Sequence, residues 1–318
     1  MANTKEIQRR IKSVANTKKI TKAMEMVAAA KMRRAIEAVL NTRTYANLSW
    51  TTVINCANSI GITGKIHPLL SKNRNVKKVA IVLMTSNRGL CGGFNSNIIK
   101  KAHESVLMHH FKDEKELIET EFVVVGRKGL SVNGRYGYKI AAEFDKLDIV
   151  SEVSEVRPIA KLLIDDFLAK KYDKVFVAFT DYISAGKQKP RVKQLLPIDV
   201  QASDDHKLGV MGKDTRVGLD EKFVHEKEEK YLSKDYVFNF EPSSNKVLNQ
   251  MVPRLIEVQL FQALLESNAS EHSARMTAMH KATDAADDMS KELVLFYNKA
   301  RQAGITSEIA EISAGAAA

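Results

Sequence analysis

The sequence predicts an α/β protein in which the N- and C-terminal helices form a long antiparallel coiled coil, with a Rossmann-like parallel α/β domain inserted between them. Three observations predict this fold. Residues 1–60 and residues 242–318 each show helical periodicity over far more than about 25 residues, a length that favours a coiled coil. Between them, over about residues 75–200, β-branched apolar runs alternate with helix-compatible stretches, as in a parallel α/β sheet.

The N-terminal helix, residues 1–60, carries an apolar seam that changes face. The seam begins at Ile7, Ile11 and Val14, shifts to Ile20, Met24 and Val27, and then continues through Ala28, Met32, Ala35 and Val39. Such shifts predict stutters, which are points where the partner helix meets a different face.

The same helix is strongly basic. Residues 1–43 contain eleven Lys or Arg and three Glu, and the whole chain has a net charge of +11. Clustered cations suit phosphates, so a basic coiled-coil nucleic-acid-binding protein is one alternative. The first aromatic residue is Tyr45, however, and no helix-turn-helix, RNA-recognition or zinc-finger pattern occurs. An acidic protein surface would satisfy the same charges, and the small apolar run Ala23–Ala30 suits a helix inside a close-fitting protein collar.

The middle of the chain predicts a βαβαβ domain covering about residues 75–200. Its strands are the apolar runs Val76–Ser86, Phe122–Gly126 and Lys174–Thr180. The stretches between them, residues 96–111 and 159–171, are compatible with helices. Right-handed crossovers then give a parallel sheet.

Two further segments complete the chain. Residues 203–235 are charged and lack a clear period, which predicts a loop or an insertion. Residues 242–318 form the second coiled-coil helix, with no Gly before Gly304. Its heptad seam runs through Leu248, Met251, Leu255, Val258, Gln262, Leu265, Ala269, His272, Met276 and Met279.

No pattern predicts a catalytic residue, a cofactor or a metal site. The Gly-rich turn Gly89–Phe94 invites a nucleotide-binding α/β interpretation, but it fails the GxGxxG spacing, and glycines for a tight strand-to-helix turn are favoured. Cys91 has no nearby His in the sequence and is expected to pack rather than react. His272, His280 and Asp284 share one helical face without an HExxH motif, which predicts a solvated face.

The compartment follows from what the sequence lacks. Cys56 and Cys91 cannot make a disulfide framework, which favours a reducing environment. No apolar run approaches the length of a bilayer span, and the polar start of the chain predicts no signal peptide. We therefore expect a protein that is soluble or peripheral and not exported.

Several long motifs resemble those of the gamma subunit of F-type ATP synthase. They are Ile7–Lys31, Thr85–Asn95, Gly126–Gly129, Ser270–Met279, Tyr297–Gln302 and Ile305–Ala317. The resemblance covers both ends and the middle of the chain. One departure is residues 203–234, which look longer than the family usually carries.

The resemblance implies the central-stalk rotor of a proton-translocating ATP synthase, a non-catalytic subunit without a cofactor. The implied partners are an alpha3beta3 catalytic hexamer, an epsilon subunit and the c-ring of the membrane sector, and nucleic acid is not among them. The implied location is peripheral, on the cytoplasmic face of a bacterial inner membrane. Neither the coupling ion nor the size of the c-ring can be read from the sequence.

The resemblance also implies which residues contact the alpha/beta ring. Met24 matches the methionine at the contact between the axle and a beta subunit. Arg301 and Gln302 match an Arg-Gln pair that hydrogen-bonds to beta-subunit loops, and Thr306 and Glu308 lie in the signature that follows.

Overall fold

The computed structural model describes residues 4–60, 67–71, 76–112, 118–147, 152–198, 241 and 243–316. The predicted charged segment, residues 203–235, lies outside them. The chain divides into two compact units. The first comprises Met1–Ala30 and Arg275–Ala318, and the second comprises Lys31–Ala274. We describe each unit by itself.

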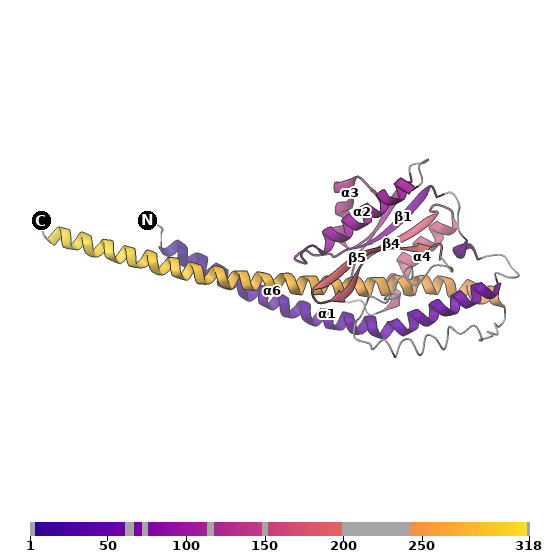
Figure 1. Cartoon of the computed structure of the whole chain (residues 1–318), viewed down its shortest axis with the longest axis horizontal. Helices are drawn as coiled ribbons and strands as arrows, with labels where there is room; N and C mark the ends of the chain where they lie inside the picture. The colour runs from indigo at the N-terminus through magenta and orange to yellow at the C-terminus, as the bar shows by residue number, and fades with distance from the viewer. Residues whose placement is uncertain are drawn as a thin grey trace. The chain divides into compact units, whose positions relative to one another are not determined.

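Two long helices, α1 (Thr4–Ile60) and α6 (Ser244–Ala316), contribute to both units. In the first unit, the hydroxyl of Thr283 donates to the Thr21 hydroxyl at 2.8 Å. In the second unit, the Thr42 hydroxyl donates to the side-chain oxygen of Gln262 at 2.8 Å. Within the first unit the partner numbers fall along α6 as they rise along α1, from Lys18 with Asp287 to Glu25 with His280, so the helices run antiparallel there. Figure 1 shows α1 and α6 running in opposite directions within the second unit as well. The predicted fold class, terminal helices with an inserted sheet domain, is confirmed.

The second unit contains a five-stranded sheet with the order β3-β2-β1-β4-β5. The strands are β1 (Lys78–Met84), β2 (Glu119–Val125), β3 (Lys139–Phe144), β4 (Lys174–Ser184) and β5 (Lys187–Leu196). The first four are parallel, and β5 pairs antiparallel with β4. The three predicted apolar runs form β1, β2 and β4. The strands β3 and β5 were not predicted, because both lie at sheet edges and carry many partly exposed polar residues.

Helices cover both faces of this sheet. They are α2 (Phe94–Lys112), α3 (Ser131–Tyr136) and α4 (Arg157–Leu168), with the 3₁₀ turns η1 (Pro68–Leu70), η2 (Arg127–Leu130) and η3 (Val153–Val156). The predicted helices 96–111 and 159–171 correspond to α2 and α4. The second ends earlier than predicted, because Lys170 adopts a left-handed backbone conformation with φ of 58°.

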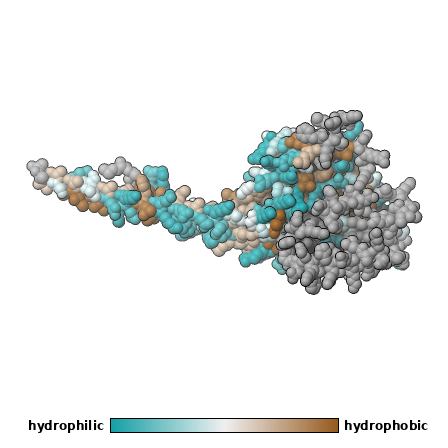
Figure 2. Space-filling model, viewed as in Figure 1, coloured by the Kyte–Doolittle hydropathy of each residue, from teal (hydrophilic) through white to brown (hydrophobic). Residues whose placement is uncertain are grey.

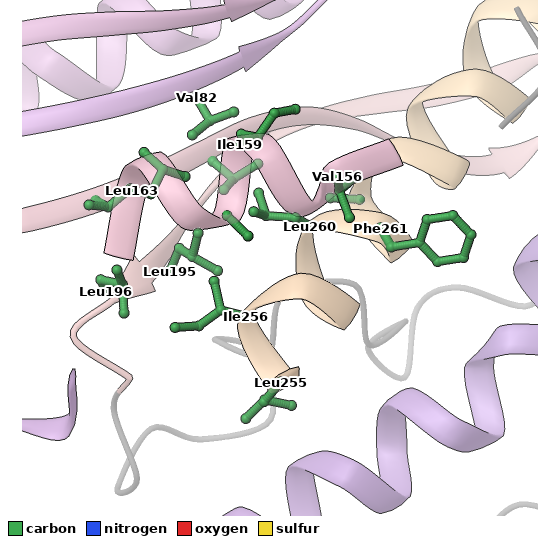
Figure 3. Packing of buried hydrophobic residues seen from close by; sticks show 14 of the residues in the cluster. Val82, Val156, Ile159, Leu163, Leu195, Leu196, Leu255, Ile256, Leu260 and Phe261 are labelled. Atoms are coloured by element: carbon green, nitrogen blue, oxygen red, sulfur yellow. The ribbon is translucent and has the colours of Figure 1, made fainter. Parts of the chain in front are cut away.

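The sheet separates two apolar cores. One lies under α2 and includes Ile98 and Phe122. The other lies between the sheet, α4 and α6 (Figure 3). There Leu163 of α4 and Ile256 of α6 join Val82 of β1. Nearly every residue of α6 from 258 to 273 is buried, so in this unit the helix is a core element rather than half of an exposed rod.

The predicted solvated face of His272, His280 and Asp284 is wrong for His272. In the second unit His272 is 2% exposed. In the first unit the side chains of His280 and Asp284 are 59% and 64% exposed. Helical spacing cannot reveal that in the second unit other elements cover α6.

Gly126 permits a close approach between the ends of β1 and β2. Its φ is 95°, and a Cβ placed on it would lie 2.5 Å from the carbonyl oxygen of Thr85. The Thr85 hydroxyl donates to the Gly126 carbonyl at 2.8 Å. Only glycine satisfies both the backbone angle and the available space.

We expect Gly126→Ala to lower the free energy of unfolding by about 3 kcal/mol or more, because backbone strain adds to the clash. Chemical denaturation measures the change. Gly134→Ala is the matched control, since nothing lies within 4 Å of a Cβ there; it should be neutral or stabilise by up to about 1 kcal/mol. Equal stability of the two variants would contradict this account of Gly126.

Candidate partner-binding surface

The first unit is a helix pair with a continuous heptad seam. On α1 the seam positions are Ile7, Ile11, Val14, Lys18, Thr21, Glu25 and Ala28, in steps of four and three. The predicted stutter is therefore wrong. Ile20 and Val27 were expected to join the seam, but they are 60% and 56% exposed. The register continues through polar residues instead of shifting to apolar ones.

The polar part of the seam consists of matched pairs. Lys18 forms an ion pair with Asp287, Thr21 accepts a hydrogen bond from Thr283, and Glu25 lies 3.3 Å from Nδ1 of His280. Hydrogen bonds from Lys18, and then from Lys291, hold the pKa of Asp287 at about 2. Directed pairs of this kind fix the register of two helices while contributing less stability than an apolar seam.

Apolar side chains point outward from the same helix pair. On α1, Ile20, Met26 and Val27 are more than half exposed, and Met24 is partly buried beside them. On α6 the exposed large apolar residues are Met289, Val294, Leu295, Phe296, Ile305, Ile309 and Ile312. Figure 2 shows brown apolar residues among teal polar ones along these helices. A surface with this many exposed apolar residues is typical of a site that binds another protein.

The C-terminal part of α6 extends past the start of α1. Because Thr21 pairs with Thr283 in antiparallel register, Thr4 lies near Arg301. The remaining turns of α6 run beyond the N-terminal end of α1 as a single helix (Figure 1). Short isolated helices are marginally stable in water, so this stretch needs a partner to stabilise it.

The predicted contact residues fall in two places. Arg301, Gln302, Thr306 and Glu308 are all exposed on the single-helix stretch, where the Thr306 hydroxyl donates to the Gln302 carbonyl at 2.9 Å. Met24 lies on α1 opposite the region of His280, about 30 Å along the helix from Arg301 at 1.5 Å per residue. The structure therefore does not gather the five into one site; they fit a surface that a partner would contact at two levels.

Part of the outward apolar surface was predicted from the sequence, because Met26 and Val27 lie in the run Ala23–Ala30 that suits a close-fitting protein collar. Ile20 and the outward residues of α6 were not predicted to belong to it. The signal for Ile20 was regular spacing, because steps of four and three connect Val14 to Ala28 through Lys18, Thr21 and Glu25 and leave Ile20 outside the seam.

The Gly-rich turn after β1 serves structure rather than anion binding. The Asn95 side chain accepts from the Ser86 amide at 3.0 Å, and the amides of Phe94 and Asn97 donate to backbone carbonyls at 3.2 and 2.9 Å. Gly92 has a φ of 57°, which a tight turn requires. Cys91 is buried against Asn95. The amides of Ser86, Phe94 and Asn97 are therefore already bonded within the turn, and these contacts give the glycines a structural role.

In the part of the chain that the structure describes, no group of three or more His, Cys, Asp or Glu side chains is arranged to hold a metal ion. Among the same residues, no helix combines the length and apolarity needed to cross a membrane.

The sequence of residues 3–318 matches the model of a family described as ATP synthase. The chain is 39% identical to the ATP synthase gamma chain of Roseiflexus castenholzii over 319 residues, covering 100% of this chain and 99% of that one. It is 40% identical over 325 residues to the gamma chain of Herpetosiphon aurantiacus, with the same coverage. The chain belongs to the ATP synthase gamma-chain family.

Solved structures share the fold of this gamma chain. A chain of the Euglena gracilis mitochondrial ATP synthase, from a structure of OSCP, F1 and c-ring, has a TM-score of 0.61 at 18% identity, covering 97% of this chain and 92% of that one. A central-stalk chain of the Tetrahymena thermophila mitochondrial enzyme has a TM-score of 0.57 at 23% identity, covering 83% and 99%. At these identities the likeness concerns the fold alone.

We expect acid to loosen the helix pair of the first unit. The pKa of Asp287 lies below its ordinary value of about 3.9, so its ion pair stabilises the pair above that pH and is lost as the pH falls toward 2. Protection of backbone amides near Lys18 and Asp287 from hydrogen exchange should therefore decrease between about pH 5 and about pH 2. Asp287→Asn should reduce protection at pH 5 and flatten this dependence, whereas the control Asp284→Asn should retain it. An unchanged profile in Asp287→Asn would show that the ion pair contributes nothing.

Proposed function

We propose that this chain is the central-stalk rotor subunit of a proton-translocating F-type ATP synthase, and that its first unit is the axle within an alpha3beta3 ring. Membership of the gamma-chain family supplies the rotor role. The single observation that supports the axle is the arrangement of the first unit: polar pairs inside the seam, apolar side chains outside, and a C-terminal helix that runs on alone.

This surface can distinguish three chemically identical catalytic sites. A two-helix axle that continues as one helix is not threefold symmetric, so each beta subunit meets a different face at any moment. A conformational equilibrium shifts only by the difference in contact free energy between its states. Rotation then changes which beta subunit is favoured in each conformation, and the chain itself carries out no nucleotide chemistry.

The proposed partners extend beyond the ring. The chain joins the alpha3beta3 hexamer, an epsilon subunit and the c-ring, and associates peripherally with the cytoplasmic face of a bacterial inner membrane through them. Two observations support this assembly. The Tetrahymena neighbour is part of a central stalk with a c-ring, and the Euglena neighbour comes from a structure of OSCP, F1 and c-ring. The relatives that this chain matches over its whole length come from bacteria.

The function is tested by reconstitution from purified alpha, beta and gamma chains. We expect no ATP hydrolysis by this chain alone, a stable complex with alpha3beta3, and ATP-driven rotation of a probe attached to the second unit when the ring is immobilised. A nucleotide-binding α/β protein would instead bind ATP in equilibrium dialysis without the ring. Turnover by the isolated chain, or failure to bind the ring, would refute the proposal.

Met24→Lys should impair coupling more than assembly. The substitution places a long cation beside the exposed Ile20 and Val27, where a ring surface would slide past. An added attraction of about 1 kcal/mol at one angle would raise the barrier to leaving that angle. The measurement is protons pumped per ATP hydrolysed in reconstituted membranes. Met24→Leu keeps the apolar volume and should behave as wild type; an unchanged ratio in Met24→Lys would remove Met24 from the sliding surface.

Arg301 and Gln302 are proposed to make directed hydrogen bonds to the ring. Replacing both by Ala should lower the ATPase activity of the reconstituted complex, because charge-assisted bonds at one rotary angle are lost. Deleting residues 315–318 should cost little, since each alanine contributes at most a methyl-sized contact of about 0.8 kcal/mol. Both variants are assayed side by side. Greater damage from the truncation would mean that the directed contacts lie elsewhere.

A further inference from the structure

The stretch of α6 within the second unit is buried yet unusually polar. Its buried polar residues are Gln259, Gln262, Glu266, Ser267, Asn268, Ser270, Glu271, His272 and Ser273, all 5% exposed or less. Burying polar groups costs free energy unless each finds a partner, and apolar residues of similar volume would often be as stable or more so. What buried polar groups can add is a unique orientation, which apolar contacts do not specify.

Two serines tie α6 to strand β4 and the turn that follows it. The Ser270 hydroxyl donates to the carbonyl of Thr180 at 3.0 Å. The Ser273 hydroxyl donates to the carbonyl of Ala185 at 2.7 Å and accepts from the Gln188 side chain at 3.1 Å. Because the acceptors are backbone carbonyls of the sheet, these bonds hold the helix to the framework of the unit.

Two carboxyl groups add further links. Nζ of Lys146, just after β3, lies 2.8 Å from the Glu271 carboxylate, and both side chains are almost fully buried. Glu266 interacts with Asp181 of β4, whose carboxylate forms an ion pair with Arg191 of β5 at 2.8 Å. Burial, and then the charge of Asp181, raise the pKa of Glu266 well above its ordinary value.

These links reach α6 from more than one direction. Glu266, Ser270 and Ser273 are spaced by four and three residues, so they share one face of the helix. Glu271 points about 100° around the axis from Ser270, toward Lys146. A turn of α6 about its own axis by about 20° would move atoms at a radius of about 5 Å by about 2 Å. A displacement of that size breaks hydrogen bonds.

We propose that Glu266, Ser270, Glu271 and Ser273 form a torsional clamp, which stops α6 from turning about its axis against the sheet of the second unit. The inference rests on the proposed rotor function, because only a shaft that transmits torque needs such stiffness. The four residues are positioning residues: they contact neither nucleotide nor the ring, and they act by fixing the angle of α6 relative to the sheet.

The test measures angular stiffness in the assembled complex. A bead is attached through Met108→Cys, an exposed position on α2, in alpha3beta3gamma held on a surface; the native Cys56 and Cys91 are buried. The angular variance of the bead is recorded in the paused complex. The double variant Ser270→Ala with Ser273→Ala removes two of the four links, so we expect about a twofold larger variance and unchanged ATPase activity without a bead.

Thr42→Val is the matched control, since it removes a partly buried hydrogen bond between α1 and α6 instead of one between α6 and the sheet. It should leave the variance as in wild type, although both variants lower the melting temperature. If the double variant does not fold, Ser273→Ala alone should give a smaller rise in variance. Wild-type variance in the serine variants, or an equal rise in Thr42→Val, would overturn the clamp.

Failure of the rotor function looks different from failure of the clamp. Wild-type complex is first given ATP with the bead attached. A wild type that binds the ring but does not rotate contradicts the proposed function, and the clamp with it. A rotating wild type combined with unchanged variance in the serine variants contradicts the clamp alone.

Discussion

The antiparallel pairing of α1 with α6 is the contact on which each unit depends. In the first unit the heptad seam joins the two helices through Lys18 with Asp287, Thr21 with Thr283 and Glu25 with His280. In the second unit α6 also covers one face of the sheet, with Leu255 and Ile256 joining Val82 and Leu163 in a single core. The heptad spacing of α6 therefore occurs in two environments: an exposed helix pair in the first unit and a buried core helix in the second.

Between Lys18 and Val27 the first unit departs from the usual distribution of side chains. An ordinary coiled coil hides apolar residues in the seam and exposes polar ones. Here Lys18 and Thr21 occupy the seam while Ile20 and Val27 face outward. Such a pair has modest stability alone and gains stability when a surrounding surface buries the outward residues. The polar pairs fix the register of α1 against α6, so the outward residues keep the same relative positions before any partner binds.

The sequence predicted the parts of the fold in which burial and periodicity agree. The runs that form β1, β2 and β4 are apolar because helices cover both faces of the sheet. The edge strands β3 and β5 were not predicted, because polar residues interrupt the apolar pattern where these strands are partly exposed. The stutter at Ile20 was wrong for a related reason: apolar residues were assumed to seek the partner helix, although a surface for another protein attracts them equally. The positions of Met24 and Arg301 on that surface came from resemblance alone, and no physical pattern in the sequence could have singled them out.

The two units use opposite chemistry for opposite mechanical needs. An axle that turns against a ring requires contacts of similar strength at every angle, and apolar contacts meet this need because they have no preferred direction. A helix that carries torque into a folded domain requires the reverse, and hydrogen bonds from Ser270 and Ser273 to backbone carbonyls meet that need because they weaken steeply with misalignment. Exchanging these two kinds of contact would meet neither requirement. Directed hydrogen bonds at positions 20 and 27 would stabilise particular rotary angles. An entirely apolar segment from 266 to 273 would stabilise α6 without fixing its orientation. The distribution of polar residues along α6, buried at Ser270 and Ser273 and giving way to exposed apolar residues from Met289 onward, follows from these two requirements.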